Sequence, residues 1–393
     1  MTTMANTIAG WFGAGKQGQH AKLQLILLTV CMLVLPFFLS GTFASGNSWV
    51  RTIDFALLYI MLALGLNIVV GYAGLLDLGY IAFYAVGAYL YALLNSPQIA
   101  GYLPVWMMNP PLLVMLLLAA AVAGCFGVML GAPTLKLRGD YLAIVTLGFG
   151  EIIRIFMNNL DRPINLTNGP QGINNIERVS LFGHEFGKPL EIFGLQFPMV
   201  HQYYYLILAF CALIIFVSIR LQRSRIGRAW VAIREDEIAA AAMGINTRNV
   251  KLLAFAMGAS FGGVSGSLFA SFQGFISPES FILMESVLVL CMVVLGGMGH
   301  IPGVILGAII VSITPEALRE VVNPLQDMLL GKRVVDPENL RMLMFGLAMI
   351  IIMLLRPEGL WPSRRRKDEL HPATKRITKQ EDATLDEAER EHE

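Results

Sequence analysis

The feature that most constrains this chain is a series of apolar runs about 20 residues long, separated by short polar segments. A helix of about 20 apolar residues can cross the ~30 Å hydrocarbon layer of a bilayer. Hydrophobic residues make up 55% of the 393 residues and charged residues only 15%, whereas soluble domains average about 25% charged residues. The sequence therefore predicts an all-α integral membrane protein, built as a polytopic helical bundle.

The apolar runs predict about ten transmembrane helices with broken, glycine-rich segments. They divide the chain into a polar N-terminal extension (1–22), a transmembrane domain (23–356) and a charged tail (357–393), of which we expect residues 363–393 to be disordered. The expected spans are 23–41, 52–71, 77–95, 112–131, 141–158, 202–220, 251–273, 284–300, 302–318 and 340–356.

Arginine is concentrated in one of the loops between the expected spans. The 221–250 loop carries five arginines, whereas the 96–111 and 274–283 loops carry no Lys or Arg. Because cytoplasmic loops carry an excess of Lys and Arg, we expect 221–250 and both termini to be cytoplasmic. The long 159–201 loop then lies outside, where it either contacts a soluble partner or caps the bundle. A second polar excursion, 319–339, is also expected outside.

One segment inside the arginine-rich loop, 228–246, is basic, then acidic, then rich in alanine. We expect one short helix here, with its acidic residues at the helix front, where the macrodipole favours anions, and Gly244 just past its C-terminus. Such a helix either seats in a groove of a cytoplasmic partner, with Glu237 helping to fix the register, or is a solvated connector. The candidate partner-contacting residues are Arg234, Glu235, Asp236, Glu237, Ala239, Ala240 and Gly244.

Small residues mark the expected contacts between helices. Gly258, Gly262 and Gly266 repeat every four residues and form a doubled GxxxG pattern. Such stripes let helix backbones approach closely in a bilayer, where no hydrophobic drive brings helices together. We therefore expect this face to be a helix-packing surface.

Two further glycine-rich stretches, 71–79 and 296–303, lie near the ends of predicted spans. Dense glycine interrupts helices, and broken helices at membrane depth usually line a cavity or a transport pathway. For Asp77, capping of the next helix is an equally open interpretation. The candidate pathway residues are Tyr72, Asp77, Gly296, Gly297 and Gly299.

Charged residues near the spans need partners or an interfacial position. Glu151 and Arg154 are three residues apart, so we expect them to pair on one helix. Asp54 and Glu285 fall at external span ends, where we expect them to be interfacial. The sequence has no GxxxxGK[ST] loop, HExxH or GxSxG motif and no Cys/His set with metal-ligand spacing. We therefore predict no catalytic residue, no metal site and no nucleic-acid partner.

Four stretches together resemble the permease subunits of ABC importers, in particular the branched-chain amino acid family. They cover parts of the chain between roughly residues 50 and 360 and are 71–87, 137–152 (LRGDYLAIVTLGFGEI), 228–244 and 293–299. Within the third, Glu237-Ile238-Ala239-Ala240 and Gly244 match the EAA-x3-G pattern of importers. The resemblance implies that 228–246 is the coupling helix, which contacts the ATPase.

The resemblance also implies the rest of the transport system. It includes two cytoplasmic ABC ATPases that bind the ATP, a second related permease subunit and a periplasmic substrate-binding protein, in a bacterial inner membrane. The implied substrates are leucine, isoleucine and valine. Because the turn at 167–170 reads TNGP rather than Gly-Gly-Pro, a permease for urea or another small amino acid-like solute stays open. An ion-coupled secondary transporter that uses Asp77 or Asp140, and a scaffold protein, are the alternatives from other classes.

Overall fold

The computed structural model describes most of residues 30–330 and a few residues beyond. The gaps are 42–45, 100–103, 105–107, 136, 138, 163–164, 182–183 and 193–194. Beyond 330 it describes 343, 346–347, 350–351, 354–355 and 359–361. The expected N-terminal extension, most of the 340–356 span and the tail beyond Trp361 therefore lie outside the described residues.

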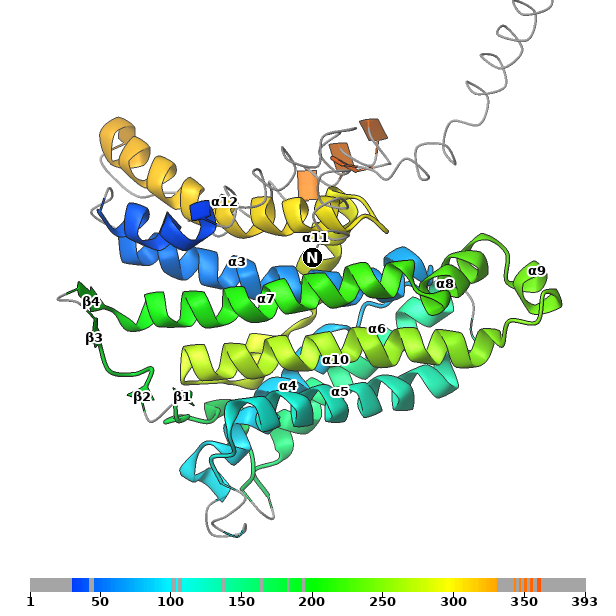
Figure 1. Cartoon of the computed structure of the whole chain (residues 1–393), viewed down its shortest axis with the longest axis horizontal. Helices are drawn as coiled ribbons and strands as arrows, with labels where there is room; N and C mark the ends of the chain where they lie inside the picture. The colour runs from blue at the N-terminus through cyan, green and yellow to red at the C-terminus, as the bar shows by residue number, and fades with distance from the viewer. Residues whose placement is uncertain are drawn as a thin grey trace, which may run out of the picture.

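Long helices dominate the described part of the chain (Figure 1). The central helix α10 (Thr247–Gln273) packs against α4 (Ile81–Leu94) and α5 (Leu112–Thr134). On its other side α3 (Gly46–Asn67) contacts α7 (Met199–Arg223), α10 and α12 (Ile301–Leu330). The short α11 (Leu283–Gly296) packs against α12 and α3, and α6 (Asp140–Asn159) lies against α4 and α5. The result is a helical bundle with α3 and α10 at its centre.

Six helical segments in the described part are long and apolar enough to cross a membrane. They are Gly46–Tyr72, Leu112–Thr134, Met199–Arg223, Thr247–Gln273, Pro278–Gly296 and Ile301–Glu320. Two further apolar helices, Val30–Gly41 and α4, are shorter. The prediction of a multi-pass helical membrane protein is confirmed, whereas the prediction of about ten spans is not.

Helix α12 extends beyond its apolar part. The apolar part, Ile301–Glu320, agrees with the predicted span 302–318, and α12 continues as a helix to Leu330 within the predicted polar excursion 319–339. The Trp49 indole nitrogen donates a hydrogen bond to the Glu320 carboxylate at 2.8 Å. This contact anchors the polar continuation of α12 to the start of α3, which the apolar pattern alone could not show.

The long loop between α6 and α7 is partly folded. Its described residues include a 3-10 turn, η4 (Gly169–Gln171), and two antiparallel hairpins. These are made by β1 (Ser180–Leu181) with β2 (His184–Glu185) and by β3 (Leu190–Ile192) with β4 (Leu195–Phe197). Ile173 and Ile276 exchange backbone hydrogen bonds of 2.9 and 3.2 Å, which tie the loop to the segment after α10. Figure 1 shows the hairpins at one end of the long helices and α8 and α9 at the other.

Glycine and serine residues of α10 lie directly against neighbouring backbones. A Cβ added at Gly258 would lie 2.9 Å from the Gly65 carbonyl oxygen of α3, and one added at Gly266 would collide with the Tyr84 carbonyl of α4. The Ser267 hydroxyl donates to the Gly87 carbonyl of α4 at 2.9 Å. Only residues this small allow these helix backbones to come so close.

The charged residues near the spans differ in their burial and in their partners. Glu151 and Arg154 form the predicted pair at 2.9 Å, so that prediction is confirmed. Asp54 is fully buried, so the expectation that it is interfacial is wrong. The reason is that α3 is enclosed by α7, α10 and α12 over most of its length. Glu285 is partly buried and accepts a hydrogen bond from the Tyr59 hydroxyl at 2.8 Å.

The first residues of the predicted tail are ordered against α11. The backbone N–H groups of Leu360 and Trp361 donate to the carbonyls of Leu295 (2.9 Å) and Gly296 (3.2 Å). The Trp361 carbonyl also lies 2.8 Å from Nδ1 of His300. These residues precede 363–393, the part of the tail that the sequence predicts to be disordered, and they complete the hydrogen bonding at the end of α11.

Candidate functional site

The segment that the sequence predicts to be cytoplasmic and to contact a partner begins with α8 (Arg225–Glu235). Ser224 caps this helix, because its hydroxyl accepts a hydrogen bond from the Gly227 N–H at 3.1 Å. The Trp230 side chain is fully buried and its indole N–H donates to the Val250 carbonyl at 2.7 Å. Trp230 thus anchors α8 to the start of α10.

The prediction of one helix within 228–246 is wrong, because the chain breaks at Asp236. Asp236 is extended (φ −155°, ψ 111°), and its carboxylate accepts hydrogen bonds from the Ile238 and Ala239 N–H groups at 2.8 and 3.0 Å. It therefore caps a second helix, α9 (Glu237–Ala242). Glu235 ends α8, and Gly244 follows α9 with φ +84°, as the sequence predicts for the residue past a helix end.

The outer surface of α9 is apolar and open. Ile238 is 76% exposed and Met243 is 83% exposed, and Ala239, Ala241 and Ala242 are exposed between them. Ala240, in contrast, is buried, so the alanine run is divided between a buried and an exposed face. Exposed apolar side chains gathered on one short element are typical of a contact surface for another protein.

Glu237 forms a contact within the chain. Its carboxylate lies 2.6 Å from the Lys251 ammonium group on α10. Lys251 is the more buried partner, with 11% of its side chain exposed against 38% for Glu237. The pair holds the first turn of α9 against α10.

The two glycine-rich stretches lie against each other. Helix α3 ends in a π-helical turn, η1 (Ile68–Tyr72), and the chain stays non-helical up to α4. Between α11 and α12, Gly297 and Gly299 have φ values of +116° and +79°. The Gly299 N–H donates to Oδ1 of Asn67 at 2.8 Å, and a Cβ at Gly71 would lie 2.6 Å from the Gly299 nitrogen. We refer to 71–79 as the first glycine segment and 296–303 as the second.

Tyr72 and Asp77 are both buried within the first glycine segment. Tyr72 lies beside Asn67 and Asp77 beside Thr146 of α6. The Asp77 carboxylate accepts a hydrogen bond from the Gly79 N–H at 2.9 Å. This contact stabilises the turn before α4, and it agrees with the capping interpretation without excluding a role in transport.

Arg234 points from α8 toward the two glycine segments. One of its guanidinium nitrogens donates to the Gly71 carbonyl at 2.6 Å. The sequence placed Arg234 with the residues expected to contact a partner; in the structure its side chain is partly buried and its head group is bonded to the end of α3.

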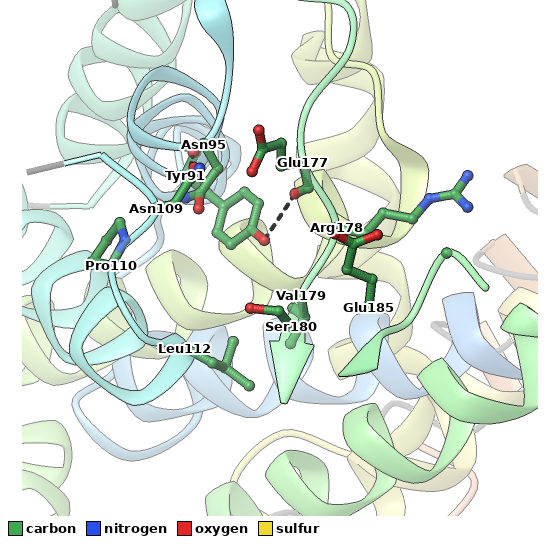
Figure 2. A pocket seen from close by; sticks show the side chains of 11 residues that line it. Tyr91, Asn95, Asn109, Pro110, Leu112, Glu177, Arg178, Val179, Ser180 and Glu185 are labelled. Atoms are coloured by element: carbon green, nitrogen blue, oxygen red, sulfur yellow. Dashed lines mark hydrogen bonds between the residues drawn. The ribbon is translucent and has the colours of Figure 1, made fainter. Parts of the chain in front are cut away.

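The hairpin end of the molecule, opposite α8 and α9, contains a cavity of about 460 Å³. It lies between the end of α4, the start of α5 and residues 177–187 of the long loop (Figure 2). The Tyr91 hydroxyl donates to the Glu177 carbonyl at 3.1 Å, and the Glu177 N–H donates to the Asn95 carbonyl at 2.6 Å. These bonds fix the loop across one side of the cavity.

Comparison with known proteins identifies the class of this chain. Residues 49–353 match the family model of the permease component of branched-chain amino acid transport systems. The chain belongs to this family. The LivM high-affinity branched-chain amino acid permease of Escherichia coli K12 is 42% identical to this permease over 357 residues, which cover 88% of this chain and 76% of LivM.

More distant relatives include the permease of an archaeon and a second type of bacterial permease. A LivM protein of Methanocaldococcus jannaschii is 27% identical over 78% of this chain and 91% of its own length. The LivH permease of Escherichia coli K12 is 28% identical over 66% of this chain and 81% of its own length. No solved structure matches the chain significantly. All of these relatives are named as transport permeases, not as enzymes.

The sequence reasoning missed three residues of the permease that organise the site. Asn67 bridges the two glycine segments, Trp230 anchors α8, and Lys251 pairs with Glu237. Asn67 had a detectable signal, because a lone amide within an apolar run needs a hydrogen-bond partner. The contacts of Trp230 and Lys251 had no such sequence signal, since their partners are more than ten residues away along the chain.

Proposed function

We propose that this permease is the membrane-spanning subunit of an ATP-driven ABC importer that carries leucine, isoleucine and valine across a bacterial inner membrane. The family match over residues 49–353 and the 42% identity to LivM support the transport system and its substrate class. In this proposal the permease binds no cofactor of its own, and partner ATPases bind and hydrolyse the ATP.

The observation that carries the ATP-driven part is the exposed apolar surface of α9. Ile238 and Met243 are exposed at the end of the bundle, while the Asp236 cap and the Glu237–Lys251 pair hold α9 in place. A rigid helix that presents apolar side chains suits a groove in a partner protein. We assign this surface to one of two ATPase subunits, with Ala239 and Gly244 leaving room for its surface.

The remaining partners follow from the relatives and from the layout of the bundle. LivM and LivH are both named as permeases of high-affinity branched-chain amino acid systems, which supports pairing with a second, related permease. We place α8, α9 and both termini in the cytoplasm. The hairpin end then faces the periplasm, where a substrate-binding protein delivers the amino acid.

The transport pathway in this proposal runs beside the two glycine segments. Its candidate residues lie at helix ends or in the non-helical connections beside them, and are Tyr72, Asp77, Gly296, Gly297 and Gly299. The stripe Gly258, Gly262 and Gly266 keeps α10 close to α3 and α4, so these helices move as one body when the pathway opens alternately to either side.

Uptake of radiolabelled leucine in cells that contain the whole system tests this function. When the proton gradient is collapsed and ATP is maintained, we expect uptake to continue. Unlabelled isoleucine and valine should compete with leucine, whereas urea should not. Uptake that follows the gradient and ignores ATP would identify a secondary transporter, and competition by urea alone would identify a urea permease.

A further inference from the structure

The C-terminal end of α3 exposes backbone carbonyl groups at the point where Arg234 arrives. At η1 the backbone hydrogen bonds span more than the four residues of an α-helix. The Ala73 N–H donates to the Ile68 carbonyl (3.2 Å), and the Leu75 N–H donates to the Val69 carbonyl (3.0 Å). The Gly71 carbonyl accepts its hydrogen bond from the Arg234 guanidinium at 2.6 Å. A helix C-terminus carries partial negative charge, so a guanidinium group is well suited to cap it.

The aliphatic part of Arg234 fits against a glycine that leaves it space. A Cβ added at Gly74 would lie 2.5 Å from Cγ of Arg234 and 3.3 Å from its Cβ and Cδ. Gly74 also has a φ of +69°, which glycine adopts without strain. The first glycine segment is therefore shaped around the arginine side chain.

The second glycine segment lies against the same guanidinium group. A Cβ added at Gly299 would lie 3.4 Å from Nη1 of Arg234. The Gly299 N–H also donates to Asn67, one residue before η1, at 2.8 Å. Arg234 is therefore hydrogen-bonded to the first segment and lies close to the second, which Asn67 links to the end of α3.

The base of Arg234 is rigidly held. The side chain leaves α8 four residues after Trp230, whose hydrogen bond to the Val250 carbonyl fixes α8 to α10. The next residues along the chain, Glu235 and Asp236, are exposed. Arg234 is thus the point at which the partner-facing segment reaches into the membrane bundle.

We propose that Arg234 is a positioning residue that transmits movement of α8 and α9 to both glycine segments together. The proposal rests on the ATP-driven import described above. When the partner ATPase displaces α9, the guanidinium group moves the carbonyl end of α3, and the Asn67–Gly299 bond carries this movement to the α11–α12 connection. Arg234 acts inward on the pathway instead of contacting the ATPase.

The test uses the complete transporter in proteoliposomes with the binding protein, radiolabelled leucine and ATP. The measured quantity is leucine imported per ATP hydrolysed, together with co-purification of the ATPase. We expect Arg234→Ala to lower this ratio about tenfold, because a part-buried hydrogen bond from a charged group is lost. Co-purification and permease level should stay at wild-type values. The ratio of Arg234→Lys should lie between those of wild type and Arg234→Ala, since an ammonium group keeps the charge without the planar fork of arginine.

Two further variants make the test specific. Arg220→Ala is the matched control, because Arg220 is an exposed arginine that stacks on Phe216 of its own helix at 5.4 Å; its ratio should match wild type. Asn67→Ala should lower the ratio, and the double variant with Arg234→Ala should be no worse than the more impaired single variant, because coupled residues are not additive.

Several outcomes would overturn the inference. An unchanged ratio in Arg234→Ala would show that the contact carries no movement, and loss of ATPase co-purification would make Arg234 a docking residue. If Arg234→Ala does not accumulate, the ratio in Arg234→Lys decides. A wild-type transporter that imports leucine without ATP, or not at all, would instead contradict the proposed function.

Discussion

At the residue scale, the structure changes what is expected of Glu237. Because Glu237 pairs with Lys251 at 2.6 Å, its first role is to hold α9 on α10. We expect Glu237→Ala to weaken this attachment by about 1 kcal/mol, since the pair is partly exposed and solvent screens it. Amide hydrogen exchange of α9 should become faster. Glu235→Ala, at an exposed position, should leave that exchange unchanged, and equal exchange in both variants would contradict the role of the pair.

Gly244 provides a sharper test of partner docking at the same scale. A Cβ at Gly244 would meet no atom within 4 Å, so a large side chain there projects away from the permease. With φ at +84°, an arginine costs about 1–2 kcal/mol of local strain. We expect Gly244→Arg to insert normally, to lose ATPase co-purification and to abolish uptake.

The matched control at this position is Gly244→Asn, because asparagine tolerates positive φ and has a small side chain. It should retain both ATPase co-purification and uptake. If Gly244→Arg still binds the ATPase and imports leucine, α9 is not the coupling element.

Individual residues were predictable from the sequence only where their partners are close along the chain. The Glu151–Arg154 pair and the position of Gly244 after a helix follow from local spacing. Arg234 could not be placed, because its partner Gly71 is 163 residues away. The burial of Asp54 was missed for the same reason, since it depends on how other helices enclose α3.

At the element scale, the glycines of α10 differ in how close the atoms of neighbouring helices lie to them. A Cβ at Gly262 would lie 3.3 Å from Cβ of Phe83 and 3.4 Å from the Tyr80 hydroxyl, whereas one at Gly266 would collide with the Tyr84 carbonyl. Backbone cannot move aside as a side chain can. We therefore expect Gly266→Ala to destabilise the permease by about 1–3 kcal/mol, more than Gly262→Ala does.

Thermal unfolding of the purified protein in detergent measures this difference. Gly148→Ala is the control, because a Cβ there would meet no atom within 4 Å. It should unfold at or slightly above the wild-type temperature, because alanine favours a helix more than glycine does. If Gly262→Ala unfolds at a lower temperature than Gly266→Ala, α10 does not pack against α4 as the structure shows.

Elements with strong apolar patterns were predictable, and those fixed by tertiary contacts were not. The long helices α5, α7 and α10 fall within a few residues of the expected spans. The division into α8 and α9 was missed, because Asp236 reads equally well as an early helical residue or as a cap. The extension of α12 was missed, because its support comes from Trp49 of another helix.

At the scale of the whole molecule, the layout predicts which end faces the cytoplasm. The hairpins and α8–α9 lie at opposite ends of the long helices (Figure 1). A reporter enzyme that is active only outside the cytoplasm should be silent when fused at Arg225 and active when inserted at Lys188, an exposed residue of the long loop. Activity at Arg225 would reverse the orientation and contradict ATPase docking at α9.

The overall architecture was predictable as a class but not as a count. Apolar length shows that helices cross the membrane, and arginine placement indicates the orientation. The number of spans depends on segments such as α4, which has 14 residues, and on 340–356, which lies largely outside the described residues. How the two glycine segments meet could not be predicted, because contacts between distant backbone segments leave no periodic signal.

The hydrogen bonds between Trp361 and α11 also set an order of events during biosynthesis. The Leu295 and Gly296 carbonyls receive their partners from Leu360 and Trp361, which a ribosome adds more than sixty residues later. Until then, the end of α11 lacks these two hydrogen bonds. The junction that Arg234 and Asn67 contact is therefore among the last parts of the bundle to be completed.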